Sequence, residues 1–185
     1  MFTGIVQAVG RIVKTKPLVI VAGRLPLSDV RVGDSICVQG CCLTVTRKAG
    51  KRLWFDVSRE TLRVTAGLAR PGDVNLEKSL ALGDRLGGHL ITGHVDGVGR
   101  VVTRKEGEVT VRTPRPLARY VARKGSICID GVSLTVNRVQ GDLFEVNLIP
   151  HTLQVTTLKR LARGTKVNLE IDLVARYLER QARTR

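Results

Sequence analysis

The chain has 185 residues, of which 43% are hydrophobic, so it can form one domain or two small ones with a buried core. No apolar run reaches the length of a membrane-spanning helix, and Met1 leads directly into a strand-like segment rather than a signal peptide. We therefore expect a soluble, cytoplasmic protein without a membrane partner.

The formal net charge of +15 raises the question of nucleic-acid binding. However, lysines and arginines are spread along the whole chain, and the three Phe, two Tyr and one Trp form no stacking cluster. We therefore expect no nucleic-acid partner and interpret the charge as a solvated surface that resists self-association.

The side chains that most often bind metals do not have the spacing of a metal site. They are Cys37, Cys41, Cys42, Cys128, His89, His94 and His151. No Cys-x-x-Cys pair occurs, and the histidines are not spaced from the cysteines as zinc ligands are. Adjacent cysteines on a strand point to opposite faces and are poorly placed to form a disulfide. Reduced thiols and no bound metal are the prediction.

The two halves of the chain repeat each other at a nearly constant interval. Four pairs of similar segments occur in the same order: 3–13 with 92–102, 39–46 with 130–137, 60–65 with 151–156, and 74–77 with 167–170. We interpret this as a tandem duplication. The predicted units are residues 1–88, residues 89–172 and a terminal helix at 173–185, with a polar, Gly-rich junction at 84–88.

Each half is predicted to be mostly β. The expected strands of the first half are 5–13, 18–22, 35–38, 43–45, 53–57 and 73–76. Those of the second half are 95–102, 109–112, 126–129, 134–136, 144–148 and 166–171. Short strands at regular spacing, separated by turn residues, favour a closed six-stranded antiparallel barrel, because closure removes exposed strand edges. The fold class is therefore all-β.

Three short helical segments are expected. Two are helical turns at 25–30 and 116–123. The third follows Asp172, where Leu173, Val174, Tyr177 and Leu178 have helical spacing among charged residues. A short isolated helix is marginally stable, so its apolar side is expected to pack either on its own barrel or on a sister subunit.

The most informative repeat is a strand with one apolar and one polar face. Residues Cys42, Thr44 and Thr46 share the polar face in the first copy, and Ser133, Thr135 and Asn137 share it in the second. Two copies in register indicate two related ligand pockets. The reactive side chains differ between the copies: Cys42 matches Ser133, Ile5 matches His94, and Glu60 matches His151.

Each reactive residue also has a purely structural interpretation. A free cysteine such as Cys42 is often a small buried hydrophobe, although its position on the polar face favours a reactive thiol equally. His94 is a structural residue or a proton-transfer group. Asp130 and Asp172 each follow an apolar strand, where they either cap a turn or helix or orient a histidine or ligand. The residues alone indicate a two-site β-barrel protein that binds small molecules.

Taken together, these motifs resemble the riboflavin synthase family of lumazine-binding barrels. The segments that carry the resemblance are 1–6, 40–46, 60–62, 87–97, 124–126, 130–137, 147–153 and 167–172. The resemblance implies two six-stranded antiparallel Greek-key barrels and a C-terminal helix that gathers three chains into a homotrimer. The first half departs from the family in its shorter loops at 13–33 and 66–72.

The resemblance also implies a reaction. Two molecules of 6,7-dimethyl-8-ribityllumazine dismutate by transfer of a four-carbon unit, giving riboflavin and 5-amino-6-(ribitylamino)uracil, without a metal or other cofactor. The site is expected between the first barrel of one chain and the second barrel of a neighbour. A non-catalytic lumazine or flavin carrier built on the same barrels is the alternative.

Matching motif positions gives the expected site residues. Chemical roles are predicted for Ser35, Cys42, His94, Ser133 and Asp172. The first pocket is expected to comprise Gly4, Ile5, Val6, Cys42, Leu43, Thr44, Asp56, Val57, Ser58, Arg59, Glu60 and Thr61. The second is expected to comprise Gly93, His94, Val95, Lys124, Ser133, Leu134, Thr135, Asn147, Leu148, Ile149, Pro150, His151 and Thr152. The sequence does not determine which pocket holds the donor lumazine.

Overall fold

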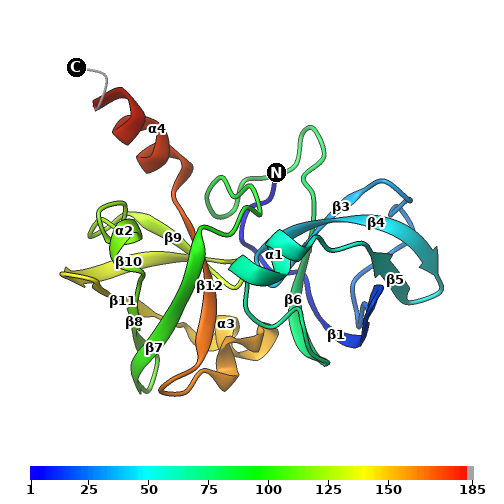
Figure 1. The fold of residues 1–185 in the computed structure, drawn as a ribbon, viewed down its shortest axis with the longest axis horizontal. Coiled ribbons are helices and arrows are strands. Elements are labelled where there is room, and N and C mark those ends of the chain that lie inside the picture. Colours follow the sequence, from blue (N-terminus) through cyan, green and yellow to red (C-terminus); the bar gives the residue numbers. More distant parts are fainter. Residues whose placement is uncertain (183–185) are drawn as a thin grey trace.

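The computed structural model describes residues 1–182, which form two closed β-barrels side by side and one helix that projects beyond them (Figure 1). The strands of the first barrel are β1 (Ala8–Thr15), β2 (Leu18–Val21), β3 (Ser35–Val38), β4 (Cys41–Ala49), β5 (Arg52–Phe55) and β6 (Gly72–Lys78). They close in the order β1-β2-β5-β4-β3-β6, with every neighbouring pair antiparallel.

The second barrel repeats the first. Its strands are β7 (Gly97–Lys105), β8 (Glu108–Arg112), β9 (Ser126–Ile129), β10 (Val132–Gln140), β11 (Leu143–Asn147) and β12 (Lys166–Ile171). They close in the order β10-β11-β8-β7-β12-β9, which is the same cyclic order when β7 is matched to β1. The predicted fold class of two six-stranded antiparallel barrels is therefore confirmed. The predicted boundary after residue 88 falls in the connection between β6 and β7.

Alternation along β4 and β10 divides each strand between the core and the outside. Cys41, Leu43 and Val45 are buried in the first barrel, as Val132, Leu134 and Val136 are in the second. Cys42 and Ser133 remain half-buried on the opposite face. Burying one face of the strand fixes its register, because a shift of one residue would turn the polar side chains into the core.

Short helices differ most from the predictions. The helical turn expected at 25–30 is wrong: this segment is an irregular loop with a bend at 28–29, and its Leu25, Leu27 and Val30 side chains are buried in the first core. Helix α2 (Arg115–Ala118) replaces the longer turn expected at 116–123. The structure adds α1 (Arg59–Val64), α3 (Pro150–Val155) and the 3₁₀ helix η1 (Thr157–Arg160), which fell outside the predicted elements.

The two barrels contact each other through equivalent segments of the two halves, with approximate two-fold symmetry. Phe2 and Ile91 form an antiparallel bridge, with backbone hydrogen bonds of 2.7 and 3.1 Å. The β3–β4 turn and the β9–β10 turn also touch. A Cβ atom on Gly40 would lie 2.9 Å from the backbone nitrogen of Gly131, so only glycine fits this close approach.

The terminal helix α4 (Leu173–Ala182) points away from the second barrel (Figure 1). Residues 183–185 of the predicted helix lie outside the described residues. Within residues 1–182, no helix combines the length and apolarity that a membrane crossing requires.

Candidate active site

Two short backbone segments precede the barrels and carry several of the predicted site residues. We call 3–6 and 92–95 the lead-in peptides. Glu77 holds the first one: its carboxylate accepts hydrogen bonds from the Thr3 amide and hydroxyl, both at 2.7 Å, and from the Gly4 amide at 3.0 Å. Charge-assisted bonds of this kind are stronger than those between neutral groups, so the peptide is held firmly.

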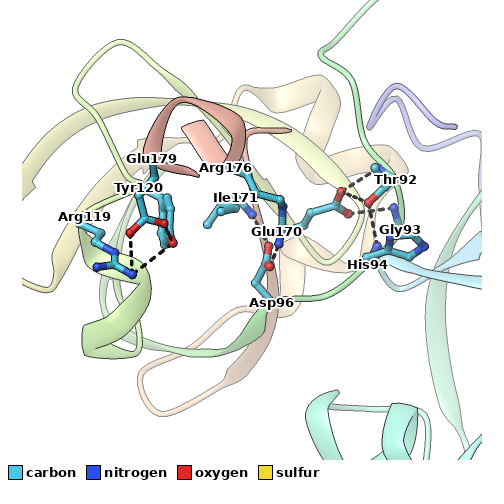
Figure 2. Close-up of polar contacts among 10 residues, drawn as sticks. All are labelled: Thr92, Gly93, His94, Asp96, Arg119, Tyr120, Glu170, Ile171, Arg176 and Glu179. Atoms are coloured by element: carbon cyan, nitrogen blue, oxygen red, sulfur yellow. Dashed lines mark hydrogen bonds and ion pairs between the residues drawn. The ribbon is translucent and has the colours of Figure 1, made fainter. Parts of the chain in front are cut away.

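Glu170 holds the second lead-in peptide in the same way. Its carboxylate accepts hydrogen bonds from the Thr92 amide and hydroxyl, both at 2.7 Å, and from the Gly93 amide at 2.9 Å (Figure 2). Burial raises the pKa of both Glu77 and Glu170, while these donated hydrogen bonds oppose the shift. The two carboxylates therefore have equivalent roles in the two halves.

Each lead-in peptide lies against the opposite barrel. The Ser133 amide on β10 donates to the Gly4 carbonyl at 2.9 Å, and the Cys42 amide on β4 donates to the Gly93 carbonyl at 2.8 Å. Gly4 and Gly93 have φ angles of +78° and +79°, and a Cβ on either would lie 2.6 Å from the Cβ of Ser133 or Cys42. Glycine is therefore required at both positions.

This exchange corrects how the predicted pockets were grouped. Matching of motif positions groups 4–6 with Cys42 and 93–95 with Ser133, whereas the backbone hydrogen bonds join Gly93 to Cys42 and Gly4 to Ser133. Side-chain packing agrees, because Val95 contacts the first core and Val6 contacts the second. An internal repeat shows which segments are equivalent but not which barrel each one contacts.

The remaining predicted residues follow β5 and β11. Val45 pairs with Phe55 in an antiparallel ladder. Residues 56–61, which follow β5, therefore leave the sheet at the end where β4 begins and Cys42 lies. Pairing of Val136 with Val146 brings 147–152 past Ser133 in the same way. The short helices α1 and α3 continue these segments: Ser58 caps α1 by accepting the Thr61 amide at 3.0 Å, and Pro150 occupies the first turn of α3.

Ser35 and Lys124, which are predicted for the site, lie on β3 and in the turn before β9. Ser35 pairs with Thr44 across β3 and β4, which puts its side chain on the same outward face as Cys42. It also lines an open hollow with Thr3, Ile5 and Glu77. Lys124 occupies the turn before β9, with a φ of +66°, and its amide donates to the Val136 carbonyl at 2.7 Å.

Cys42 differs from the other cysteines in its surroundings. All four cysteines are free thiols, and Cys42 is half-buried while Cys37, Cys41 and Cys128 are buried. Burial raises the pKa of Cys41 to about 12 and raises the pKa values of Cys37 and Cys128 as well. Buried thiols of this kind are inert, so Cys42 is the cysteine best placed to meet a ligand.

The two candidate aspartates have local structural roles. The Asp172 carboxylate accepts the Val174 amide at 2.9 Å and caps α4, while its carbonyl accepts the Arg176 amide at 3.3 Å. Asp130 lies in the β9–β10 turn and accepts the Asn168 amide at 2.8 Å. His94 and His151 are exposed, and the His94 amide donates to the Thr92 hydroxyl at 3.2 Å.

His89 lies outside the residues predicted for either pocket. Its Nδ1 atom lies 2.7 Å from the Ser133 hydroxyl oxygen. Burial lowers the pKa of His89 from its usual 6.5, and the negative charge of Asp172 opposes this shift. The available signal was its position in Gly87-Gly88-His89, immediately before the repeated Thr-Gly motif. Within residues 1–182, no group of three or more metal-ligating side chains is placed to hold an ion.

Comparisons with known proteins agree with the two-barrel geometry. A model of the lumazine binding domain matches residues 3–79 and 92–172. The riboflavin synthase of Mycobacterium tuberculosis is 47% identical over 199 aligned residues, covering 100% of this chain and 99% of the relative. The chain belongs to the riboflavin synthase family. The riboflavin synthase of Brucella abortus is 43% identical and covers 98% of both chains.

Solved structures place the same fold around flavin-like ligands. LumP complexed with riboflavin has a TM-score of 0.79 and 31% identity, covering 92% of this chain and 99% of that one. LumP complexed with 6,7-dimethyl-8-(1'-D-ribityl) lumazine has a TM-score of 0.76 and 30% identity, covering 92% of this chain and 98% of that one. The resemblance to the riboflavin synthase family is therefore confirmed, while the role of each site residue stays a prediction.

Proposed function

We propose that the chain catalyses the reaction of the riboflavin synthase family: dismutation of two 6,7-dimethyl-8-ribityllumazine molecules to riboflavin and 5-amino-6-(ribitylamino)uracil. The observation that carries this proposal is full-length similarity to riboflavin synthases in a chain whose two equivalent barrels have unlike reactive side chains. A dismutation converts two identical molecules into different products, so two similar pockets with different chemistry suit it.

The protein contributes positioning and proton transfer to this reaction. One lumazine must lose a proton from an acidic methyl group, and the other must accept a nucleophile. Holding the two rings face to face lowers the entropic part of the barrier. We assign Cys42 and His94 to the pocket on β4, and Ser133 and Asp172 to the pocket on β10. Ser35 supports the first pocket from β3.

We propose that the complete site forms between neighbouring chains of a homotrimer. Support comes from α4, where Val174, Tyr177 and Leu178 are 59%, 63% and 63% exposed at helical spacing. The helix is nevertheless fixed in direction. Arg176 binds Asp96 at 2.6 Å, and Glu179 binds Arg119 at 2.7 Å and also the Tyr120 hydroxyl (Figure 2). Polar contacts to its own barrel thus present an apolar side to other copies.

Turnover is the direct test of this function. The purified protein is mixed with 6,7-dimethyl-8-ribityllumazine, and riboflavin and the pyrimidine product are quantified against time. We expect riboflavin and the pyrimidine in equal amounts and one riboflavin for every two lumazines consumed. A doubly substituted protein, Cys42→Ala with Ser133→Ala, controls for spontaneous conversion. Tight lumazine binding without any product would remove the enzymatic function.

A lumazine or flavin carrier is the second candidate function. It is favoured by the similar LumP structures, which are complexes with riboflavin, flavin mononucleotide and the lumazine itself. A carrier would bind these ligands stoichiometrically and release them unchanged. The same assay separates the two functions, because only the enzyme consumes lumazine.

We also propose a cytoplasmic location. It is supported by four free thiols, since the cytoplasm keeps such groups reduced. Cell fractionation checks this proposal, and recovery of the chain mainly from an oxidising compartment would contradict it.

A further inference from the structure

The His89 ring is held beside Ser133 by the backbone as well as by its own hydrogen bond. The His89 amide donates to the Thr3 carbonyl at 3.1 Å, and its Nδ1 atom lies 2.7 Å from Ser133 Oγ. Thr3 itself is fixed by Glu77 on β6. The imidazole is therefore attached to the first lead-in peptide and reaches a side chain on β10 of the second barrel.

Two glycine backbones enclose the Ser133 side chain. A Cβ on Gly88 would lie 2.9 Å from Ser133 Cβ and 3.0 Å from its Oγ, and a Cβ on Gly4 would lie 2.6 Å from Ser133 Cβ. Backbone this close leaves a side chain few accessible rotamers. The two glycines thus restrict Ser133 on one side, and its hydroxyl lies toward His89.

The surroundings of His89 favour a neutral ring. Its Nε2 atom is buried and has no hydrogen-bond partner among residues 1–182. Desolvation penalises an imidazolium, while Asp172 at the start of α4 acts in the opposite direction. Glu77 on β6, the carboxylate that binds the first lead-in peptide, is occupied by Thr3 and Gly4. A neutral Nδ1 can accept the serine proton, whereas an imidazolium can only donate.

The matching position in the first half lacks this arrangement. Cys42 receives a backbone contact from Gly93, but no histidine hydrogen-bonds to its thiol within the described part of the chain. The contact between His89 and Ser133 therefore distinguishes the second pocket from the first by more than the exchange of sulfur for oxygen.

We propose that His89 is the positioning residue of the second pocket: in its neutral form it accepts the Ser133 hydroxyl proton and thereby directs the oxygen lone pairs of that hydroxyl at the bound lumazine. This proposal rests on the proposed function, because it gives Ser133 a ligand to act on. His89 acts through Ser133 and need not touch the substrate.

Four variants test the proposal by steady-state kinetics: His89→Leu, His89→Asn, Ser133→Ala and the double variant His89→Leu with Ser133→Ala. His89→Leu should lower kcat about 10- to 100-fold, with KM little changed. A residue that acts through Ser133 is expected to contribute no more than the low end of the roughly 10²- to 10⁴-fold typical of a direct proton-transfer group. His89→Asn should recover most of kcat, because its amide oxygen can occupy the place of Nδ1. The double variant should be no slower than Ser133→Ala, since both changes remove one unit.

A pH profile provides a readout that a purely structural role would not move. In the unaltered protein, kcat should fall as the pH drops through the pKa of His89, which lies below 6.5. This acid limb should disappear in His89→Asn, whose amide does not titrate. Thermal melting and lumazine binding, followed by fluorescence, show whether each variant is folded.

Three results would overturn the proposal: wild-type kcat in His89→Leu, an equal loss in His89→Asn and His89→Leu, or a double variant slower than Ser133→Ala by the full His89→Leu factor. If His89→Leu does not fold, the rate and acid limb of His89→Asn decide alone. Absence of riboflavin from the unaltered protein would instead remove the proposed function, so the two failures are distinguishable.

Discussion

The side-chain amide of Asn75 on β6 donates a hydrogen bond of 2.8 Å to the main-chain carbonyl of Asp130 in the β9–β10 turn. Asn168 on β12 does the same to the Gln39 carbonyl in the first barrel, also at 2.8 Å. Both asparagines are 1% exposed. Each barrel therefore satisfies a buried or part-buried backbone carbonyl of the other, which favours folding of the two barrels as one unit.

Replacing Asn75 by alanine should destabilise the whole chain. The change leaves the Asp130 carbonyl and the Thr157 amide without their partner, because Thr157 donates to Asn75 Oδ1 at 2.8 Å. The buried Asp130 carbonyl alone costs about 1–3 kcal/mol when it loses its partner, and the part-buried Thr157 amide adds less. Urea unfolding should show one transition at a lower midpoint, whereas alanine at the exposed Gln154 should leave the midpoint unchanged. Loss of only one of two separate transitions would contradict the coupling of the barrels.

The carboxyl group of Asp130 should make stability depend on pH. Burial raises the pKa of Asp130 from 3.8 to about 7, although hydrogen bonds from Asn168 and Gln39 act to lower it. The folded protein thus binds this proton more tightly than the unfolded chain. The contribution of the protonated Asp130 to the free energy of unfolding is fully present below about pH 4 and is lost as the pH rises to about 7. A pKa difference of about three between the folded and unfolded states corresponds to roughly 4 kcal/mol.

Asp130→Asn is the matched variant, because the equivalent residue in the first half is the neutral Gln39, which accepts the Asn75 amide at 2.9 Å. The unaltered protein should lose melting temperature between pH 5 and pH 8, and Asp130→Asn should lose less. The exposed Asp84→Asn variant should follow the unaltered protein. Parallel curves for Asp130→Asn and the unaltered protein would show that this carboxyl does not titrate in that range.

The strands were predictable from sequence because burial of one face imposes alternation on each of them. The duplication was equally visible, since equivalent positions kept the same residue types. The start of β1 was misplaced: the predicted strand began at Ile5, whereas β1 begins at Ala8. Residues 4–6 look like the start of that strand locally, but they are held by Glu77 and lie on the other barrel.

The parts of the site that were missed depend on contacts distant in sequence. His89 meets Ser133 across 44 residues, and neither its spacing nor its neighbours show a partner. Helix α1 is the exception, because its cap is local: Ser58 accepts the Thr61 amide three residues away, so this helix could be predicted from the sequence. Side-chain chemistry was thus predictable within each half, whereas contacts between the halves required the three-dimensional structure.

The exposed side of α4 should control assembly. Leu178→Glu places a charge on the apolar stripe proposed to join three copies, where burial of an unpaired charge is strongly unfavourable. Light scattering should show a smaller particle at the same protein concentration, and riboflavin formation should fall with it. Val32→Glu is the matched control, because Val32 is 64% exposed and lies in a loop of the first barrel. An unchanged mass for Leu178→Glu, or for a chain ending at Asp172, would contradict the helix-mediated trimer.

Cys42→Ser should separate reactivity from packing. The thiol is half-buried and the serine hydroxyl is of similar size, so the melting temperature should change little. A rate decrease of about tenfold or more is expected if the thiol takes part in proton transfer or addition, because a hydroxyl is far less acidic than a thiol. An unaltered rate would make Cys42 a packing residue.

Glu170→Gln tests the exchange of the lead-in peptides. The glutamine oxygen can still accept from Thr92, but its NH₂ group then faces the Gly93 amide, which donated to the carboxylate at 2.9 Å. An orphaned buried donor costs about 1–3 kcal/mol, so the second lead-in peptide should be held less firmly and lumazine affinity at the pocket on β4 should fall. Because Gly93 lies on Cys42, bound lumazine should protect Cys42 from iodoacetamide in the unaltered protein and much less in this variant.

Glu77→Gln is the matched control for that experiment. This change removes a hydrogen-bond acceptor from the first lead-in peptide, whose Gly4 contacts Ser133. It should therefore lower lumazine affinity at the pocket on β10, while lumazine still protects Cys42 from alkylation. Alkylation is followed by mass spectrometry of the peptide that contains Cys42. If Glu77→Gln exposed Cys42 and Glu170→Gln did not, each lead-in peptide would serve the pocket of its own barrel, and the crossed arrangement would be wrong. The expected pattern, in contrast, requires that a carboxylate on β12 of the second barrel controls ligand binding at β4 of the first.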